Sequence, residues 1–432
     1  SLRKQAKLIS GNGSWNTFAL PECSIESIQM NDGPCGLRIP SLNSNDSNLE
    51  TSLKATAFPT PSLLACSWDL ELMKEVGASF ANEAIEKGTD VLLAPGINIK
   101  RNPLCGRNFE YYSEDPLLAG ELGASFINGL QENGVGACLK HFAANNSEYH
   151  RLTSSSEVDM RALREIYLKG FEIAIKKSNP WSVMCSYNRL NGVYASQNEW
   201  LLDQVLRKEW GYEGLLMSDW GAVLDPVLAH ARGLDLEMPC FEKTRPSLLS
   251  KAAKKGKLPK NKILEEADRV ATLSKKVQEA KNRSKERMNN GHEVALKAAL
   301  NSIVLAKNDG ILPLKSFADV SVIGPFAKEP HFQGFGSSHV NTEHLTNFFE
   351  EASKKLGKPL SYAKGYDPYG KENEEALRLD AVDLASTSKA VLLFLGTNYS
   401  EESEGFDRRD MRLDERQIRL FEAIAAQNEN II

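Results

Sequence analysis

Apolar runs of strand length alternate with amphipathic helical stretches through residues 27–239, and this alternation is the strongest constraint on the fold. A helix that follows each strand returns the chain to the same edge of the sheet, so that neighbouring strands run parallel. Repeated units of this kind predict an α/β fold whose most economical form is a (β/α)8-like TIM barrel. The predicted strands are 27–32, 90–99, 136–142, 182–188, 214–220 and 233–239.

Between these strands, apolar residues recur at helical spacing. In one stretch Leu118, Leu122 and Phe126 lie four residues apart, after Pro116 and before Gly134. Proline is common at the first position of a helix and glycine just after its end. The predicted helices are 67–88, 116–134, 158–178 and 199–211.

The later part of the chain predicts a second domain. Residues 243–290 are rich in lysine and glutamate and poor in strands, and we interpret them as a last barrel helix and a linker. Apolar runs at 319–327 and 390–400 then predict an α/β sandwich. We therefore expect a barrel domain at 1–285 and a sandwich domain at 286–432. The final NENII resembles the opening of another strand, so we expect an incomplete sandwich and a missing C-terminal portion of the same protein.

The composition argues against several kinds of partner. The net charge of −5 argues against nucleic acid, and no run approaches the roughly 20 apolar residues of a membrane span. The seven cysteines are odd in number and form no CxxC pair, which favours reduced thiols and a cytoplasmic location. No cysteine–histidine spacing resembles a zinc site, and we predict neither a metal ion nor a cofactor.

The apolar run at 214–218 ends abruptly at Asp219, which Trp220 follows. A buried strand that ends in a carboxylate places this charge at the C-terminal rim of a parallel barrel, where active sites lie. A carboxylate can stabilise an oxocarbenium-like carbon, and an indole can pack on the apolar face of a sugar. The alternative is a helix cap, because aspartate often begins the helix that follows a strand.

Polar side chains follow four further predicted strands. Because the C-terminal ends of barrel strands converge on one mouth, we expect these groups to lie close together. Such a ring of donors and acceptors suits a small polyhydroxylated ligand, whose hydroxyl groups need partners once they leave water. Taken singly, each group is explained equally well as a cap or a surface ion pair. The residues are Asp32; Arg101, Arg107 and Glu110; Lys140 and His141; and Tyr187 and Asn188.

Several motifs occur in an order that spans essentially the whole chain. They are DGPCGLR at 32–38, GRNFEYYSEDP at 106–116, KHFAANN at 140–146, SYN at 186–188 and SDW at 218–220. Together they resemble glycoside hydrolase family 3, the β-glucosidase-like enzymes. The resemblance implies a barrel followed by an α/β sandwich, and a retaining mechanism in which the SDW aspartate, Asp219, is the nucleophile.

A retaining mechanism needs a second carboxyl group, about 5–5.5 Å from the first, to protonate the leaving oxygen. The barrel offers Glu110 and Glu148 as candidates. The family pattern instead implies Glu404, in the SEGFDR loop at 403–408 of the second domain. We expect ionised Asp219 to raise the pKa of Glu404 and to keep it protonated until the glycosyl–enzyme forms.

The resemblance also implies which residues contact the substrate. Asp32 would accept hydrogen bonds from sugar hydroxyl groups, and Lys140 with His141 would donate to others. Lys140 has a rival role as a Schiff-base lysine, as in aldolases of this fold, but no phosphate-binding glycine loop accompanies it. The implied contacts are Asp32, Arg107, Lys140, His141, Arg151 and Tyr187, with Trp220 lining the pocket.

These residues predict a retaining, exo-acting β-glycosidase. The first interpretation is a β-glucosidase that acts on a small glycoside or oligosaccharide. The KHFAANN motif lacks the proline–glycine and the Asp–His dyad of the family's N-acetylhexosaminidases, which disfavours that activity. A β-xylosidase or an α-L-arabinofuranosidase stays open, because one hydroxymethyl group separates glucose from xylose. A non-catalytic sugar-binding fragment is a further alternative for the function. The sequence also leaves open whether the protein forms a homo-oligomer.

Overall fold

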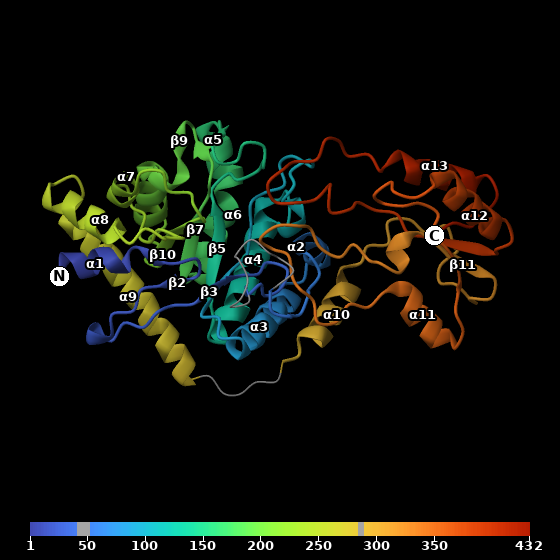
Figure 1. Ribbon diagram of the computed structural model, residues 1–432, viewed down its shortest axis with the longest axis horizontal. Coiled ribbons are helices and arrows are strands. Elements are labelled where there is room, and N and C mark those ends of the chain that lie inside the picture. The colour runs from blue at the N-terminus through green and yellow to red at the C-terminus, as the bar shows by residue number, and fades with distance from the viewer. Residues whose placement is uncertain (41–51, 284–288) are drawn as a thin grey trace. The chain divides into compact units, whose positions relative to one another are not determined.

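The computed structural model describes residues 1–40, 52–283 and 289–432, and this part of the chain forms two compact units (Figure 1). The first unit comprises Ser1–Ile303 and two short later segments, Phe335–Glu343 and Glu404–Asp407. The second unit comprises Val304–Gly334, His344–Ser403 and Arg408–Ile432. The expected domain boundary at 285/286 lies outside the described residues.

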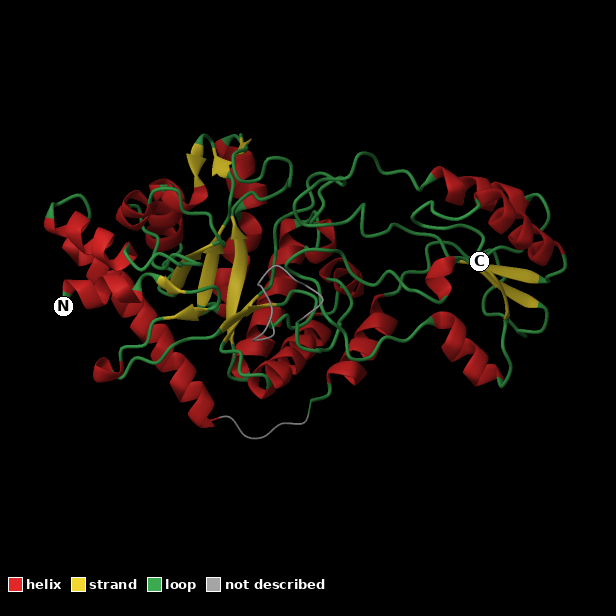
Figure 2. Ribbon diagram, in the orientation of Figure 1, coloured by secondary structure: helices red, strands yellow, loops and turns green. Residues whose placement is uncertain are grey.

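Parallel strands form the centre of the first unit (Figure 2). Five strands of the described chain pair in the order β10–β7–β5–β4–β3. Every residue in them is buried, as expected for a parallel sheet that is covered on both faces. The predicted strands are confirmed here, although most are shorter than predicted. The bounds are β3 (Met30–Asp32), β4 (Val91–Leu93), β5 (Gly136–Phe142), β7 (Ser182–Cys185) and β10 (Leu215–Ser218).

The N-terminal residues close this sheet into a ring. The predicted strand at 233–239 pairs in parallel with β10 on one side and with Ser10 on the other. A hairpin of β1 (Gly11–Asn12) and β2 (Asn16–Thr17) follows and pairs with the residues that lead into β3. The fold is therefore TIM-barrel-like, as predicted, with an antiparallel hairpin in place of two parallel strands.

Helices surround the sheet, and all four predicted helices are confirmed. Asp69 caps the start of α3 and Asp115 that of α4, each through its side-chain oxygen. These two helices cross so closely that a Cβ at Gly129 would lie 2.0 Å from Lys74 O, so only glycine fits. The helices of the first unit in the described ranges are α1 (Leu2–Leu8), α2 (Pro61–Leu64), α3 (Leu70–Glu86), α4 (Pro116–Glu132), α5 (Met160–Ala162), α6 (Lys169–Ser178), α7 (Pro226–Ala231), α8 (Arg245–Lys254), α9 (Lys260–Arg283) and α10 (Gly291–Ser302), with π-helical turns at Leu163–Tyr167 and Trp200–Glu209. A small sheet contains β6 (Ser155–Ser156), β8 (Arg189–Leu190) and β9 (Val193–Tyr194).

A buried carboxylate, Asp235, ties β10 to the elements around it. Its Oδ2 accepts the Leu216 N–H at 2.7 Å and pairs with Arg207, and its Oδ1 lies 2.8 Å from Arg269. Asp235→Ala would leave two arginines and a strand amide without this partner. We therefore expect the free energy of unfolding to fall by about 3–5 kcal/mol, measured by urea unfolding.

The matched control is Glu22→Ala, which removes one partner of the exposed Lys4–Glu22 pair. Because water screens that pair, we expect its loss to leave the free energy of unfolding nearly unchanged. An Asp235→Ala variant no less stable than the Glu22→Ala variant would contradict the structural role of Asp235.

The second unit is an α/β sandwich around a small parallel sheet. Its strands pair in the order β12–β11–β13, and Ile431 extends the sheet through a parallel bridge to Val391 of β13. The final NENII run therefore takes part in the sheet, as its pattern predicts. α12 and α13 pack on one face and α11 on the other. The bounds are β11 (Val320–Ile323), β12 (Ser361–Ala363), β13 (Ala390–Leu393), α11 (Phe348–Leu356), α12 (Glu374–Ser386) and α13 (Glu415–Ala425). Across the residues that the structure describes, no helix combines the length and the apolar character that crossing a membrane requires.

Candidate active site

A cavity of about 340 Å³ lies at the C-terminal ends of the barrel strands, within the first unit. Its walls come from residues in or just after β3, β5, β7 and β10, and from the two later segments of this unit. The lining residues are Ser14, Trp15, Asp32, Arg38, Arg107, Lys140, His141, Met184, Tyr187, Asp219, Trp220, Pro239, Phe241, Ser337 and Glu404.

The structure brings eight of the nine implied site residues into the lining of this cavity. The ninth, Arg151, contacts the Glu404 side chain. Three other strand-end residues do not line the cavity. Glu110 pairs with Arg107 instead. Arg101 lines a separate surface pocket, and Asn188 donates to the main-chain oxygens of Ala143 and Arg189.

Asp219 follows β10 directly, and one of its carboxylate oxygens is unsatisfied. Its N–H donates to Cys185 O at the end of β7 (3.1 Å), and its Oδ1 accepts the Trp220 N–H (2.7 Å). Its Oδ2 is buried, has no hydrogen-bond partner among the described residues, and lies 3.7 Å from His141 Nε2. The helix-cap alternative is wrong, because Asp225 caps the next helix, α7. Oδ2 is therefore available to a ligand.

The surroundings of Asp219 also change its acidity. Burial raises the pKa of Asp219 to about 6, against the lowering effect of Arg107 and Lys140. The negative charge of Glu404 adds to the rise. Asp219 is therefore ionised at neutral pH, in surroundings that solvate its charge poorly.

Glu404 reaches the same cavity from the short segment 404–407. Its N–H donates to Phe335 O (2.9 Å), and its Oε2 accepts the Ser337 N–H (2.7 Å). Between these two partners lies Gly336, with φ at +118°. A Cβ at Gly336 would lie 2.4 Å from the Glu404 Cβ, so glycine leaves the space that the glutamate occupies.

Two arginines hold the Glu404 carboxylate in its charged form. Oε1 lies 2.6 Å from Arg151 and 3.6 Å from Arg107. Burial alone would raise the pKa of Glu404, but the two guanidinium groups and the Ser337 hydrogen bond hold it well below its usual range. The expectation that Asp219 keeps Glu404 protonated in the free site is therefore wrong, because two cations lie directly against the carboxylate and outweigh any effect of Asp219.

The two arginines are fixed in turn by Glu110 and Glu148. Arg107 is buried with its Nε 2.5 Å from Glu110 Oε1. Arg151 lies 2.9 Å from Glu148 Oε2, and its guanidinium group stacks 4.7 Å above the ring of Tyr187. Neither glutamate belongs to the cavity lining in the described chain. The two alternative proton donors are therefore counterions of the arginines.

A second charged group surrounds Asp32. Its Oδ2 lies 3.1 Å from Arg38 Nη1, and its Oδ1 lies 3.9 Å from Lys140 Nζ. Burial raises the pKa of Asp32, and the charges of Lys140 and Arg38 oppose this rise. An acceptor flanked by two cationic donors matches neighbouring hydroxyl groups on a sugar ring.

His141 contributes a neutral imidazole. Its burial, together with the charges of Arg107 and Lys140, holds the pKa of His141 well below its ordinary value. Its Nδ1 contacts the Tyr111 hydroxyl at 3.1 Å. Asn98 bonds to the main-chain N–H and oxygen of His141, each at 2.9 Å. The ring is therefore held as an uncharged hydrogen-bonding group.

Comparison with known protein families identifies the family of this chain. The description "Glycosyl hydrolase family 3 N terminal domain" matches residues 21–273, and "Glycosyl hydrolase family 3 C-terminal domain" matches residues 303–432. The chain belongs to glycosyl hydrolase family 3. The resemblance drawn from the motifs is confirmed, and with it the predicted barrel and sandwich.

Curated relatives and solved structures of family 3 are longer than this chain. The chain is 44% identical over 436 residues to thermostable beta-glucosidase B of Acetivibrio thermocellus, a match that covers 100% of this chain and 58% of the relative. It is 41% identical over 445 residues to the exo-alpha-(1->6)-L-arabinopyranosidase of Bifidobacterium longum, with the same coverage. The crystal structure of the Bifidobacterium adolescentis GH3 beta-glucosidase matches with a TM-score of 0.91 and 40% identity, over 100% of this chain and 62% of that one. The chain thus spans less than two thirds of the length of these relatives.

Several lining residues of this family 3 site were missed in the sequence. Arg38 ends the DGPCGLR motif, and its charge close after a strand was a usable signal. Trp15 comes from the N-terminal hairpin and packs 5.5 Å from the Trp220 ring, but no periodicity marks it. Ser337 follows no predicted strand, so only the folded chain reveals it. Phe241 comes two residues after the predicted strand at 233–239, but it is an apolar residue and was not among the polar strand-end groups.

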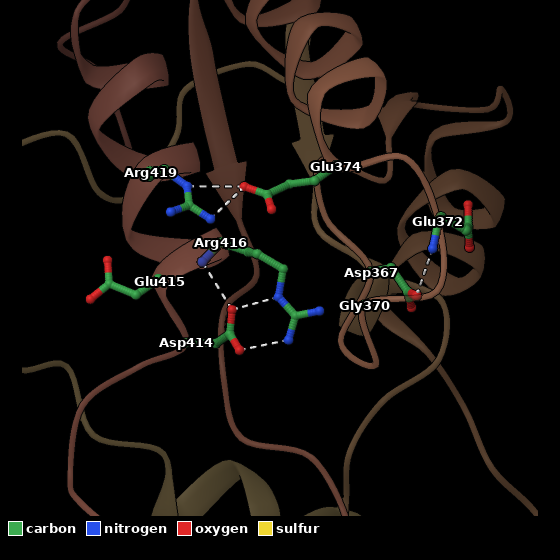
Figure 3. A pocket seen from close by; sticks show the side chains of 8 residues that line it. All are labelled: Asp367, Gly370, Glu372, Glu374, Asp414, Glu415, Arg416 and Arg419. Carbon is green, nitrogen blue, oxygen red and sulfur yellow. Dashed lines mark hydrogen bonds and ion pairs between the residues drawn. The ribbon is translucent and has the colours of Figure 1, made fainter.

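A second pocket, of about 370 Å³, lies in the sandwich and is rich in charge (Figure 3). Arg416 makes two contacts to the Asp414 carboxylate, and Arg419 makes two to Glu374. Asp367 accepts main-chain N–H groups of its own loop. Because these charges already pair within the pocket, we assign no site to it. Within the described ranges, no group of histidine, cysteine, aspartate and glutamate is placed to hold a metal ion.

Proposed function

We propose that the protein is a retaining, exo-acting β-glucosidase that hydrolyses terminal, non-reducing β-D-glucosyl residues. One observation carries the proposal: Oδ2 of Asp219 is buried without a partner among the described residues, in a cavity that also holds the Glu404 carboxylate. A retaining glycosidase needs such a pair of carboxyl groups. The names of the beta-glucosidase relatives support the same activity.

Asp219 is the nucleophile in this proposal. Its Oδ2 attacks the anomeric carbon as the bond to the leaving oxygen breaks, and a covalent glycosyl–enzyme forms. Its Oδ1 stays bonded to the Trp220 N–H, which fixes the orientation of the carboxylate. The Trp220 Nε1 donates to Ser14 O at 2.8 Å, so the indole offers the sugar a fixed apolar face.

Glu404 is first the acid and then the base. The hydroxyl groups of an entering sugar compete with Glu404 for Arg107 and Arg151, which weakens the contacts of both arginines with the carboxylate and raises the pKa of Glu404. Glu404 then delivers a proton to the leaving oxygen. Once Asp219 is an uncharged ester, ionised Glu404 removes a proton from the water that attacks the anomeric carbon. In the free site Glu404 is already ionised, which is the charge state that this second step needs.

The remaining polar groups bind the glucosyl residue. Asp32 accepts from its hydroxyl groups, and Lys140 donates to them. A cavity of about 340 Å³ walled by charged groups suits one terminal sugar, which is why we propose exo action. The proposed contacts are Asp32, Arg107, Lys140, His141, Arg151 and Tyr187, with Trp220 lining the cavity.

An α-L-arabinopyranosidase is the second candidate, because a relative with 41% identity bears such a name. Rates on 4-nitrophenyl β-D-glucoside and 4-nitrophenyl α-L-arabinopyranoside separate the two activities. A clear preference for the arabinopyranoside would replace the glucosidase proposal with this one.

We also propose a cytoplasmic location. All seven cysteines are free, and five of them are buried. Burial raises the pKa of Cys105 and Cys138 to about 12 each, which keeps these thiols protonated and unreactive. Free thiols are typical of reducing compartments.

Labelling with 2-deoxy-2-fluoro-β-D-glucosyl fluoride tests the proposed function. The fluorine at C2 slows breakdown of the glycosyl–enzyme, so peptide mass spectrometry should find one glucosyl label, on Asp219. The Asp225→Asn variant, changed at the exposed cap of α7, is the matched control and should label at the unaltered rate. A label on another residue would overturn the role of Asp219. A protein that does not label and turns over neither aryl glucosides nor aryl arabinopyranosides would instead support the sugar-binding alternative.

A further inference from the structure

Glu404 lies on a four-residue segment that is anchored to the first unit at three points. At its start, the Glu404 N–H donates to Phe335 O (2.9 Å). One residue later, the Gly405 N–H donates to Glu148 Oε2 (2.8 Å). At its end, the Asp407 carboxylate binds two separate stretches of the same unit. The path of the main chain is therefore fixed at Glu404 itself and along the three residues that follow it.

The Asp407 carboxylate makes the largest of these contacts, because it accepts four hydrogen bonds. Its Oδ1 accepts the N–H groups of Gly106 (3.0 Å) and Glu148 (2.9 Å). Its Oδ2 accepts the Ser147 hydroxyl (2.6 Å) and the Tyr149 N–H (3.1 Å). Burial alone would raise the pKa of Asp407, but these donors outweigh it and lower the pKa, so the carboxylate stays charged.

The four donors lie next to the two arginines that contact Glu404. Gly106 directly precedes Arg107, and the donors at 147–149 lie shortly before Arg151. One carboxylate thus fixes the end of the glutamate's segment and the main chain beside both arginines. Hydrogen bonds to a charged acceptor are roughly twice as strong as neutral ones, so their loss would loosen all three parts together.

We propose that Asp407 is a positioning residue that sets the place of Glu404 relative to the leaving oxygen of the substrate. The inference rests on the proposed function of Glu404 and extends it, because Asp407 is not among the lining residues of the cavity in the described chain. A displacement of about 1 Å can cost a catalytic group about 10²-fold in rate. Loosening the segment leaves the bonds of Asp219 intact and impairs proton transfer.

Asp407→Ala in the full chain tests this role. We expect kcat/KM for cellobiose or methyl β-glucoside, whose leaving groups need a proton, to fall on the order of 10²-fold. For 2,4-dinitrophenyl β-glucoside, whose leaving group does not need a proton, we expect the formation of the glycosyl–enzyme to slow by less than about tenfold. The loss on the poor substrates should appear in kcat, with KM little changed. The basic limb of the pH profile of kcat, which reports the proton on the acid in the substrate complex, should also move.

Two further variants complete the design. Ser147→Ala removes one of the four donors to Asp407. Its loss of kcat/KM should depend on the leaving group in the same way and should be smaller than that of Asp407→Ala. Asp410→Ala is the matched control, because Asp410 is an exposed aspartate of the same loop that pairs with Arg412. Its kinetics should match those of the unaltered protein on every substrate.

The outcomes separate this inference from the function on which it rests. A folded Asp407→Ala protein with no loss, or with equal losses on both kinds of substrate, overturns the positioning role. If Asp407→Ala does not fold, Ser147→Ala decides in the same way. An unaltered protein that turns over no glucoside overturns the proposed function and the inference together. The inference alone is overturned by a third outcome. In that outcome the unaltered protein is active, the loss of kcat/KM in Glu404→Ala depends on the leaving group, and the loss in Asp407→Ala does not.

Discussion

Asp219→Gly is expected to lower kcat/KM for aryl β-glucosides by roughly 10⁴- to 10⁶-fold, because it removes the oxygen that bonds to the anomeric carbon. The barrel should survive the change, since β10 keeps its main-chain pairing with β7. Added azide should enter the vacated position and restore part of the turnover. Because it replaces the nucleophile, azide attacks from the side of Asp219, and the product should be the α-glucosyl azide. Kinetics with an aryl glucoside and NMR of the product measure both effects.

The control for this variant is Asp225→Gly, six residues later in an exposed helix cap. It should retain activity close to that of the unaltered protein. A loss of less than tenfold for Asp219→Gly, or an azide product in the β configuration, would exclude Asp219 as the nucleophile.

Glu404→Ala should slow the hydrolysis of a substrate to an extent that depends on its leaving group. For alkyl glucosides and cellobiose, kcat/KM should fall by about 10²- to 10⁴-fold, because no positioned acid protonates the leaving oxygen. The first step on 2,4-dinitrophenyl β-glucoside should change little, whereas breakdown of the glycosyl–enzyme should slow because the base is also lost. Azide should then speed turnover and give the β-glucosyl azide, since Asp219 still forms the ester. Burst kinetics and NMR of the product measure these effects.

Glu402→Ala is the matched control, because Glu402 belongs to the same loop and pairs with Arg408. This variant should show the kinetics of the unaltered protein. Two results would exclude Glu404 as the acid and base. They are a loss of kcat/KM in Glu404→Ala that is equal for all leaving groups, and an α-glucosyl azide as the product.

The sequence predicted the layered fold well where periodicity was strong. The strand at 136–142 has the predicted ends, and the helix predicted at 116–134 is α4. Closure of the barrel was not predictable, because β1 and β2 each contain two residues and carry no alternation. A pairing this short is set by the neighbours that it meets across the sheet, and local pattern does not contain this information.

The sequence also marked Asp219 and Glu404 through the order of its motifs, and the structure places both carboxylates in the lining of one cavity. The charge state of these two groups depended on tertiary contacts. Arg107 and Arg151 are 297 and 253 residues from Glu404 in sequence, yet they contact its Oε1 and lower its pKa. Likewise, only the fold shows that Oδ2 of Asp219 is buried without a hydrogen-bond partner among the described residues.

What the sequence alone determined was therefore the kind of fold and the family, and it marked the two carboxylates that we propose to react, because periodicity and motifs are local properties of the chain. What only the tertiary structure decided was how these groups are held and charged. Asp407 illustrates the difference: in sequence it is one carboxylate in an acidic loop, whereas in the fold it accepts four hydrogen bonds beside both arginines. Electrostatic and hydrogen-bond energies depend on distance in space, and spacing along the chain does not give that distance.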